Sequence, residues 1–378
     1  SCRSQRLWPN VHLPSSLAQG GHAHAQTRAN CQCEAVSGQE VTFTICLICD
    51  TFGSLYTVNV ALQSGSIPTQ GEATRVAMGR LLTRITGRPD AARELIFLNL
   101  LDKAEDFVLE IGRLDRDTLT VTFDEQSIER ELRSLDQPVW GPERPLTLIW
   151  VAVDAGFGQR SILSGETSEP QNELAMTDLD DRLRQEILRA AYDRGLPIAF
   201  PLLDLEDMAS LAFVDVWGGF NDRIRKASVR YKADAILSGR VRVSEFGDNV
   251  QWTLIWGDWE RGITTATLGE GLDHVAEIYA EEFGAIGRSR TTQITVLGVT
   301  ESSHYFEVLS YMDSLSFLES VKVEQYGPAG LLLRITWRGD LDLLQRMFDL
   351  GNVLIPANTM GTKNGERAPN NLAFRLLH

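Results

Sequence analysis

The stretch RGLPIAFPLLDLEDMASLAFVDVWGGFNDRIRKASVRYKADAILSGRV, from Arg194 to Val241, decides the fold that the sequence predicts. It reads in order as a short apolar strand, an acidic turn, a Gly-Gly turn, a helix and a second strand. Such alternation of strands and helices predicts a sheet with helices packed against it. The stretch contains no recognisable catalytic motif, so it predicts a fold but no enzymatic activity.

This stretch lies at the centre of a predicted module that covers residues 145–288. The apolar run at 146–153 is typical of a strand that is buried on both faces. Gly195 follows a predicted helix at the position where a glycine commonly ends helices. The predicted helices are 177–194, 221–232 and 272–283, and the later strands are 235–243, 250–256 and 263–268. We therefore expect a mixed sheet covered by helices.

Two further modules flank this one, over residues 54–144 and 289–378. The first reads as a strand at 55–62, helices at 70–87 and 89–101, a hairpin over 107–123, and a helix at 125–135 capped by Asp124. The last module reads β-α-β-β-α-β, which is the ferredoxin-like order. The predicted fold class is therefore α+β, built from three small α/β modules.

Residues 1–40 contain few large aliphatic side chains, so disorder is expected there, and we expect the whole segment 1–53 to be disordered or the remnant of a secretory signal. The apolar run at 41–49 resembles the hydrophobic region of a signal, although an ordinary strand or helix of a longer protein fits it too. All five cysteines lie here, at Cys2, Cys31, Cys33, Cys46 and Cys49. With His22 and His24 their spacing approaches that of a zinc site, but the last two cysteines fall inside the apolar run. We therefore predict no metal and no cofactor.

Composition excludes several classes of protein. The formal net charge of −15 opposes binding to a phosphate backbone, so nucleic acid is not an expected partner. No apolar run approaches the roughly 18 residues that cross a bilayer as a helix. The motifs GxSxG, GxxxxGK[ST], HExxH and GxGxxG at a strand-to-helix turn are missing as well.

The acidic turn at Asp204, Glu206 and Asp207 has two interpretations. Neighbouring carboxylates can share a proton or hold a hard cation, which would make the turn a catalytic or binding site. Alternatively, Asp204 caps a helix, with Asp207 near the capping-box position and Glu206 favourable against the helix dipole.

A second candidate site is the segment from Asp215 to Phe220. Gly218 and Gly219 permit positive φ angles and a close backbone approach, while Trp217 and Phe220 have the character of interface anchors. We therefore predict a turn that contacts a partner. The alternative is that both aromatic rings are buried and that the glycines only shape the turn.

Three tryptophans form the third candidate, at Trp252, Trp256 and Trp259. Aromatic faces can stack on sugars, so the group is a candidate glycan site. The first two also share one face of a predicted strand, where an interior position explains them equally well.

Three segments carry a resemblance to a known family: ATRVAMGRLLTRITGRP (73–89), PVWGPERPLTLIWVAVD (138–154) and the stretch 194–241. Together they resemble the bacterial domain-of-unknown-function family numbered 2066, most specifically in DVWGGF and RYKADAILSGRV. The resemblance implies an exported periplasmic protein of Gram-negative bacteria with no assigned activity. More distantly, the middle module resembles the amino-terminal domain of TolB and related envelope lipoproteins, which bind partners in assemblies.

These observations together predict a non-catalytic binding or assembly factor of the cell envelope whose partner is another envelope protein. The alternatives are a hydrolase or glycan-processing enzyme that uses the acidic turn, and a glycan-binding module that uses the tryptophans.

Overall fold

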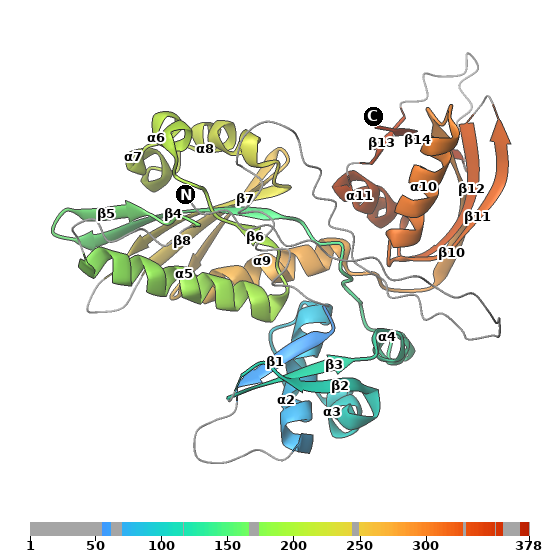
Figure 1. Cartoon of the computed structure of the whole chain (residues 1–378), viewed down its shortest axis with the longest axis horizontal. Coiled ribbons are helices and arrows are strands. Elements are labelled where there is room, and N and C mark those ends of the chain that lie inside the picture. The colour runs from blue at the N-terminus through green and yellow to red at the C-terminus, as the bar shows by residue number, and fades with distance from the viewer. Residues whose placement is uncertain are drawn as a thin grey trace, which may run out of the picture. The chain divides into compact units, whose positions relative to one another are not determined.

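Three β-sheets organise the part of the chain that the computed structural model describes: residues 55–61, 70–115, 117–165, 174–243, 249–327, 330–351, 353–357 and 371–377. Each sheet takes its strands from one of three successive ranges of the sequence, and helices pack against each (Figure 1). The chain is therefore an α+β protein, as expected. The boundaries near residues 144 and 288 stay predictions, and the segment 1–53 with its cysteines lies outside the described residues.

The first sheet is antiparallel, in the order β1-β3-β2. Its strands are β1 (Thr57–Ala61), β2 (Val108–Arg113) and β3 (Thr118–Phe123), and its helices are α2 (Gln70–Thr86), α3 (Leu98–Asp102) and α4 (Glu125–Ser134). Gly87 follows α2 with φ of +74°, and a Cβ there would collide with Ala280. A glycine is thus needed both to end α2 and to let the helix α9, described below, approach closely.

The single helix predicted for 89–101 is wrong. Short 3₁₀ turns at Ala91–Arg93 and Leu95–Phe97 lead into α3 instead. Ala91 and Phe97 are both buried, six residues apart. That spacing does not fall on one face of an α-helix, so a regular helix would turn one of the two side chains toward solvent.

The second sheet is mixed, in the order β5-β4-β7-β8-β9, with β6 also paired to β4. Strand β4 is parallel to β6 and β7, and the other pairs are antiparallel. The strands are β4 (Thr147–Gly156), β5 (Gln159–Ile162), β6 (Ile198–Ala199), β7 (Ala235–Arg242), β8 (Asn249–Trp256) and β9 (Trp259–Thr265). This is the mixed sheet that the sequence predicted.

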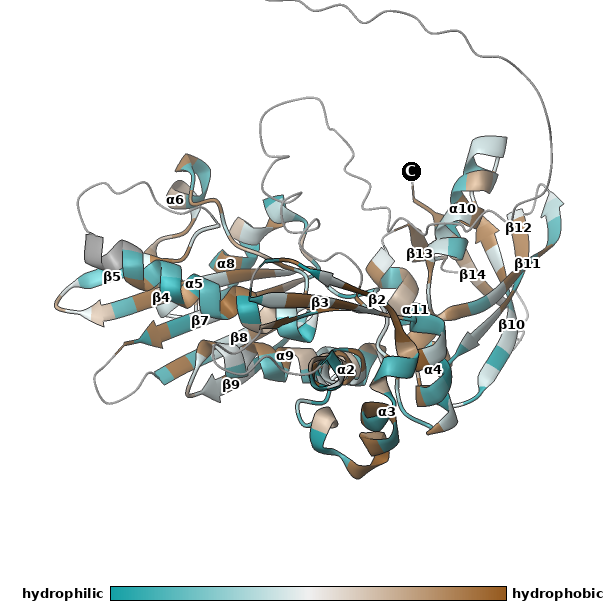
Figure 2. Ribbon diagram, turned by 60° about the horizontal axis from the view of Figure 1, so that its bottom comes forward, coloured by the Kyte–Doolittle hydropathy of each residue, from teal (hydrophilic) through white to brown (hydrophobic). Residues whose placement is uncertain are grey.

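Helices cover both faces of the second sheet. Strand β4 sends Ile149, Val151 and Val153 into one core and Leu148, Trp150 and Ala152 into another, which is why its sequence is apolar without alternation. The first core lies under α5 (Leu174–Arg194) and α9 (Leu268–Phe283), and the second lies under α6 (Leu205–Ser210), α7 (Phe213–Trp217) and α8 (Asn221–Ser228). Figure 2 shows apolar residues along β7 and β8 and polar residues along much of α5.

The third sheet has the order β11-β12-β10-β14-β13. Its elements are β10 (Ser289–Leu297), α10 (Ser302–Ser314), β11 (Leu318–Gly327), β12 (Gly330–Arg338), α11 (Leu341–Gly351), β13 (Leu354–Pro356) and β14 (Asn371–Leu376). The β-α-β-β-α-β order of a ferredoxin-like fold is present up to β13. Strand β14, which the sequence did not predict, pairs in parallel with β10 and separates it from β13.

The buried side chain of Arg144 joins the C-terminal ends of α2 and α5, which pack against the first and the second sheet. Arg144 donates through Nη2 to the carbonyl of Arg84 (3.0 Å), at the end of α2, and through Nη1 to that of Arg194 (2.8 Å), at the end of α5. Its guanidinium also lies 3.7 Å from the Trp140 ring centroid. Because the last carbonyls of a helix have no intrahelical donor, the guanidinium satisfies the C-terminal ends of two helices at once.

Candidate functional site

The acidic turn follows β6 and begins α6. Asp204 is the N-cap of α6, because its side chain accepts a hydrogen bond from the backbone N–H of Asp207 (3.0 Å). Arg230 holds the same carboxylate with both terminal nitrogens, at 2.7 and 2.8 Å. The capping interpretation is therefore confirmed, and an arginine 26 residues away completes it.

Asp207 is 1% exposed and is fully engaged. It accepts hydrogen bonds from the backbone N–H of Leu203 (2.9 Å), from Arg230 (3.0 Å) and from the hydroxyl of Tyr231. Glu206 instead points outward and lies 3.7 Å from Arg230. The three carboxylates thus surround one guanidinium and do not converge on a cavity.

The charge state of the turn follows from these contacts. Hydrogen bonds from Arg230 hold the pKa of the Asp204 carboxyl well below its usual range. Asp204 is therefore ionised at neutral pH, and it cannot supply the proton that a general acid must give. These ion pairs fix the start of α6 against the 3₁₀ helix Val229–Tyr231 that follows α8.

The segment from Asp215 to Phe220 is partly helical and only partly the turn that the sequence predicted. Asp215 and Trp217 belong to α7, and Asp215 is buried while its carboxylate accepts from the backbone N–H of Ala212 (2.9 Å). Gly219 has φ of +66°, whereas Gly218 has an ordinary φ of −77°. Gly219 is therefore needed for its positive φ, and Gly218 for a close approach, because a Cβ there would lie 2.9 Å from the carbonyl oxygen of Val214. The Asp215 carboxylate caps α7.

The aromatic side chains of this segment have different environments. Phe220 is 54% exposed, so the alternative interpretation, in which both rings are buried, is wrong for it. Trp217 is half-buried and stacks on Phe213, with ring centroids 5.6 Å apart and planes inclined by 19°. Phe213 was missing from the sequence-based site.

The guanidinium of an arginine lies over each of these three aromatic rings. Arg160 lies 5.5 Å from the Phe213 centroid, Arg242 lies 5.5 Å from that of Trp217, and Arg223 lies 5.9 Å from that of Phe220. Such distances are those of cation–π pairs. We call these six residues, Phe213, Trp217, Phe220, Arg160, Arg223 and Arg242, the arginine–aromatic surface.

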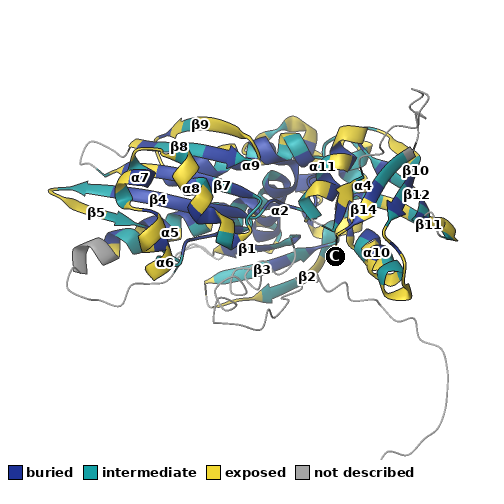
Figure 3. Cartoon of the chain, turned by 90° about the horizontal axis from the view of Figure 1, so that it is seen from above, coloured by how far each residue is buried: buried dark blue, intermediate teal, exposed yellow. Residues whose placement is uncertain are grey.

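The sheet assembles this surface from distant segments. Arg160 comes from β5 and Arg242 from β7, on either side of β4, and α7 packs over all three strands (Figures 1 and 3). Arg240 has the same parity in β7 as Arg242 and donates to the backbone carbonyl of Trp217 (3.0 Å). The alternation Arg240-Val241-Arg242 was the one local signal available, because residues two apart in a strand share a face.

Exposed apolar side chains occur on the elements that carry the arginine–aromatic surface and the acidic turn, and on the turns next to them. Phe157 at the β4–β5 turn is fully exposed, and Val214 of α7, three residues before Trp217, is exposed as well. On α6 and after α8 the exposed apolar residues are Leu205, Met208 and Val229. An accumulation of this kind marks interaction surfaces.

The three tryptophans are not brought together as one exposed site. Trp252 is buried between Gly239 of β7 and Gly271 of α9, where a Cβ on either glycine would overlap the indole. Trp256 packs against Tyr279 and Phe283 of α9, at 5.6 and 5.2 Å between ring centroids. Trp259 alone is exposed, so the interior interpretation is confirmed for Trp252.

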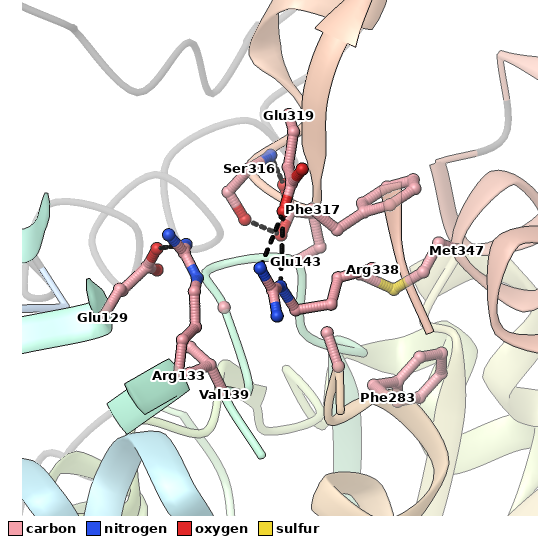
Figure 4. A pocket seen from close by; sticks show the side chains of 12 residues that line it. Glu129, Arg133, Val139, Glu143, Phe283, Ser316, Phe317, Glu319, Arg338 and Met347 are labelled. Atoms are coloured by element: carbon pink, nitrogen blue, oxygen red, sulfur yellow. Dashed lines mark hydrogen bonds and ion pairs between the residues drawn. The ribbon is translucent and has the colours of Figure 1, made fainter. Parts of the chain in front are cut away.

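A small cavity lies elsewhere, between α4, the segment before β4 and the third sheet (Figure 4). Glu143 accepts hydrogen bonds from the backbone N–H and the hydroxyl of Ser316, and burial raises the pKa of its carboxyl. The ion pair of Glu319 with Arg338 (3.1 Å) borders it. The cavity holds about 30 Å³, enough for water but not for a substrate, and it contains none of the predicted site residues.

Within the described ranges, no three His, Cys, Asp or Glu side chains gather closely enough to hold a metal ion. Nor does any helix in that part of the chain have the length and apolar character to cross a membrane. The cysteines and the two histidines of the suggested zinc spacing lie outside these ranges.

The comparison with known proteins finds a match in the part of the chain that contains the first sheet. A family model described as a domain of unknown function (DUF8605) matches residues 50–141, which contain β1 to β3 and end before β4. No curated protein and no solved structure matches the chain significantly. The matched range therefore contains neither the acidic turn nor the arginine–aromatic surface, and it brings no activity with it.

Proposed function

We propose that this chain is a non-catalytic binding or assembly factor of the bacterial cell envelope that contacts a protein partner through the arginine–aromatic surface. The carrying observation is the exposed Phe220, which follows the stacked pair of Phe213 and Trp217 by three residues in the chain. Aromatic residues and arginine dominate the energy of protein interfaces. The stacked rings are held rigidly, so little side-chain entropy is lost when a partner binds.

The periplasmic location is part of this proposal and rests on the sequence. The apolar run at 41–49 and the resemblance of DVWGGF and RYKADAILSGRV to the family numbered 2066 support it.

The catalytic alternative has little physical support. A general acid or a metal ligand needs carboxylate oxygens that are free to reach a substrate, whereas Asp204 and Asp207 are occupied by Arg230 and by backbone donors. The glycan-binding alternative loses Trp252, which is buried, and keeps Trp259 with the half-buried Trp256, whose ring centroids lie 5.7 Å apart. Trp256 also packs against Tyr279 and Phe283, so this pair exposes little aromatic surface for a sugar.

The proposal is tested by photo-crosslinking in the intact protein. Phe220 is replaced by benzoylphenylalanine, and the protein is irradiated in envelope extracts. Phe306 of α10 receives the same replacement as a control, because it is 68% exposed and lies on the third module. We expect a discrete protein adduct from position 220 that position 306 does not give.

A second variant separates binding from accidental proximity. Adding Arg242→Gln to the crosslinking protein should reduce the adduct without unfolding, since Arg242 is exposed. Equal adducts from positions 220 and 306, or none from position 220, would contradict the proposal.

A further inference from the structure

The arginine–aromatic surface has a charge opposite to that of the whole chain. Its arginines Arg160, Arg223 and Arg242 are joined by Arg240, while the chain has a formal net charge of −15. The carboxylates that contact these guanidiniums are Asp154, at 3.6 Å from Arg160, and Asp215, at 2.6 Å from Arg223. Four guanidiniums against two carboxylates leave the surface locally positive.

The arginine side chains of this surface also expose their N–H donors to solvent. Arg160 and Arg223 are 55% and 67% exposed, in contrast to Arg230 of the acidic turn at 20%. A guanidinium that lies over an aromatic face presents its N–H edge sideways, which is the geometry that a carboxylate accepts in pairs. Because the rings fix the guanidiniums in place, less rotamer entropy is lost when an acceptor binds.

From these observations we infer that the arginine–aromatic surface binds an acidic peptide segment of the partner, with carboxylates on the guanidiniums and apolar side chains against Phe220 and Val214. This inference rests on the proposed function and names the chemistry of its partner. Val214 of α7 and Phe220 are both exposed, and the guanidinium of Arg223 lies over the Phe220 ring, so these residues offer apolar and cationic contacts together.

Charge and composition favour an acidic peptide over single-stranded nucleic acid, which also binds to arginines and stacked rings. A nucleic acid carries a charge at every phosphate, and a chain of net charge −15 repels that array beyond the small positive area. A short peptide can place a few carboxylates locally and add aliphatic side chains that suit Val214.

The test measures peptide binding by fluorescence anisotropy. The probe is a fluorescein-labelled decapeptide of eight glutamates and two leucines, compared with the same peptide carrying lysine in place of glutamate and with the oligonucleotide (dT)₁₀. The variant is Arg160→Gln with Arg242→Gln. The control is Arg93→Gln with Arg334→Gln, which removes the same charge from exposed arginines of the first and third sheets' modules.

We expect the glutamate peptide to bind and the lysine peptide not to bind. The Arg160→Gln, Arg242→Gln variant should lose at least about tenfold in affinity, because it removes two guanidiniums that donate charge-assisted hydrogen bonds to the peptide carboxylates. The control variant should stay within about twofold, and circular dichroism should show both variants folded.

Three outcomes would overturn the inference: no binding of the glutamate peptide, equal losses in variant and control, or tighter binding of (dT)₁₀ through the same arginines. If the crosslink from position 220 forms and the glutamate peptide does not compete with it, the inference fails while the proposed function stands. If no crosslink forms, the proposed function itself fails.

Discussion

At the scale of single residues, we expect the buried Asp207 to contribute most of the stability of the acidic turn and the exposed Glu206 to contribute little. Asp207→Ala removes the acceptor of Arg230, Tyr231 and a backbone N–H in a buried position, so we expect a loss of about 3–5 kcal/mol in the free energy of unfolding. Glu206→Ala is the matched control and should change it by less than about 0.5 kcal/mol. Urea unfolding measures both, and similar losses would contradict the assignment.

Asp204 should make stability depend on pH in acid. Its pKa is lowered in the folded state by hydrogen bonds from Arg230. Its contribution is therefore complete above the unfolded-state pKa of about 3.9 and is lost as the pH falls toward the folded-state value. Asp204→Asn keeps the cap but has no charge, so its stability should fall less steeply below about pH 4. Parallel curves for both proteins would show that the ion pair contributes nothing.

Gly271 illustrates a residue whose role depends entirely on one neighbour. Gly-to-Ala changes inside a helix usually stabilise by about 1 kcal/mol. A methyl group at Gly271 would instead overlap the indole of Trp252, so Gly271→Ala should destabilise by about 1–3 kcal/mol. Gly269 is in the same helix, and its Cβ would make an ordinary 3.6 Å contact with Ala190. Gly269→Ala should be neutral or stabilising, and thermal unfolding distinguishes the two.

At the scale of elements, hydrogen bonds to the ends of helices stabilise contacts between helices that the apolar periodicity of the sequence does not predict. Arg144 serves the C-terminal carbonyls of α2 and α5, which belong to different modules. Arg144→Lys keeps the charge but cannot reach both helices, because an ammonium lacks the planar fork of donors. We expect a loss of at least about 2 kcal/mol, from carbonyls left without donors.

The control for this change is Arg133→Lys, on a partly exposed helix face, which should cost less than about 1 kcal/mol. Guanidinium chloride unfolding followed by tryptophan fluorescence measures both variants. If Arg144→Lys were as mild as Arg133→Lys, the bridge between the helix ends would have no energetic role.

At the scale of the whole molecule, a chain that begins at Ser54 should keep the same thermal midpoint and should not respond to zinc or to a chelator. The reason is compositional, since residues 1–40 have few large aliphatic side chains and residues 1–53 hold every cysteine. Differential scanning calorimetry of the full and shortened chains makes the comparison. A drop of several degrees, or zinc bound only by the full chain, would favour the metal interpretation.

The sequence by itself determined the elements whose signals are local. The unbroken apolar run of β4, the glycine after α2 and the cap at Asp204 are each encoded within a few residues, because periodicity and capping act between near neighbours. The mixed sheet and the β-α-β-β-α-β order followed from such signals in sequence.

Tertiary structure alone decided the features that join distant segments. Strand β14 is placed by pairing with β10, 78 residues earlier, and the arginine–aromatic surface depends on β5 and β7 lying on either side of β4. Arg160 and Arg242 are 82 positions apart, so no periodicity relates them. Strand pairing is a contact between backbones that leaves no pattern in either strand alone, and this is why the candidate site emerged only once the sheet was assembled.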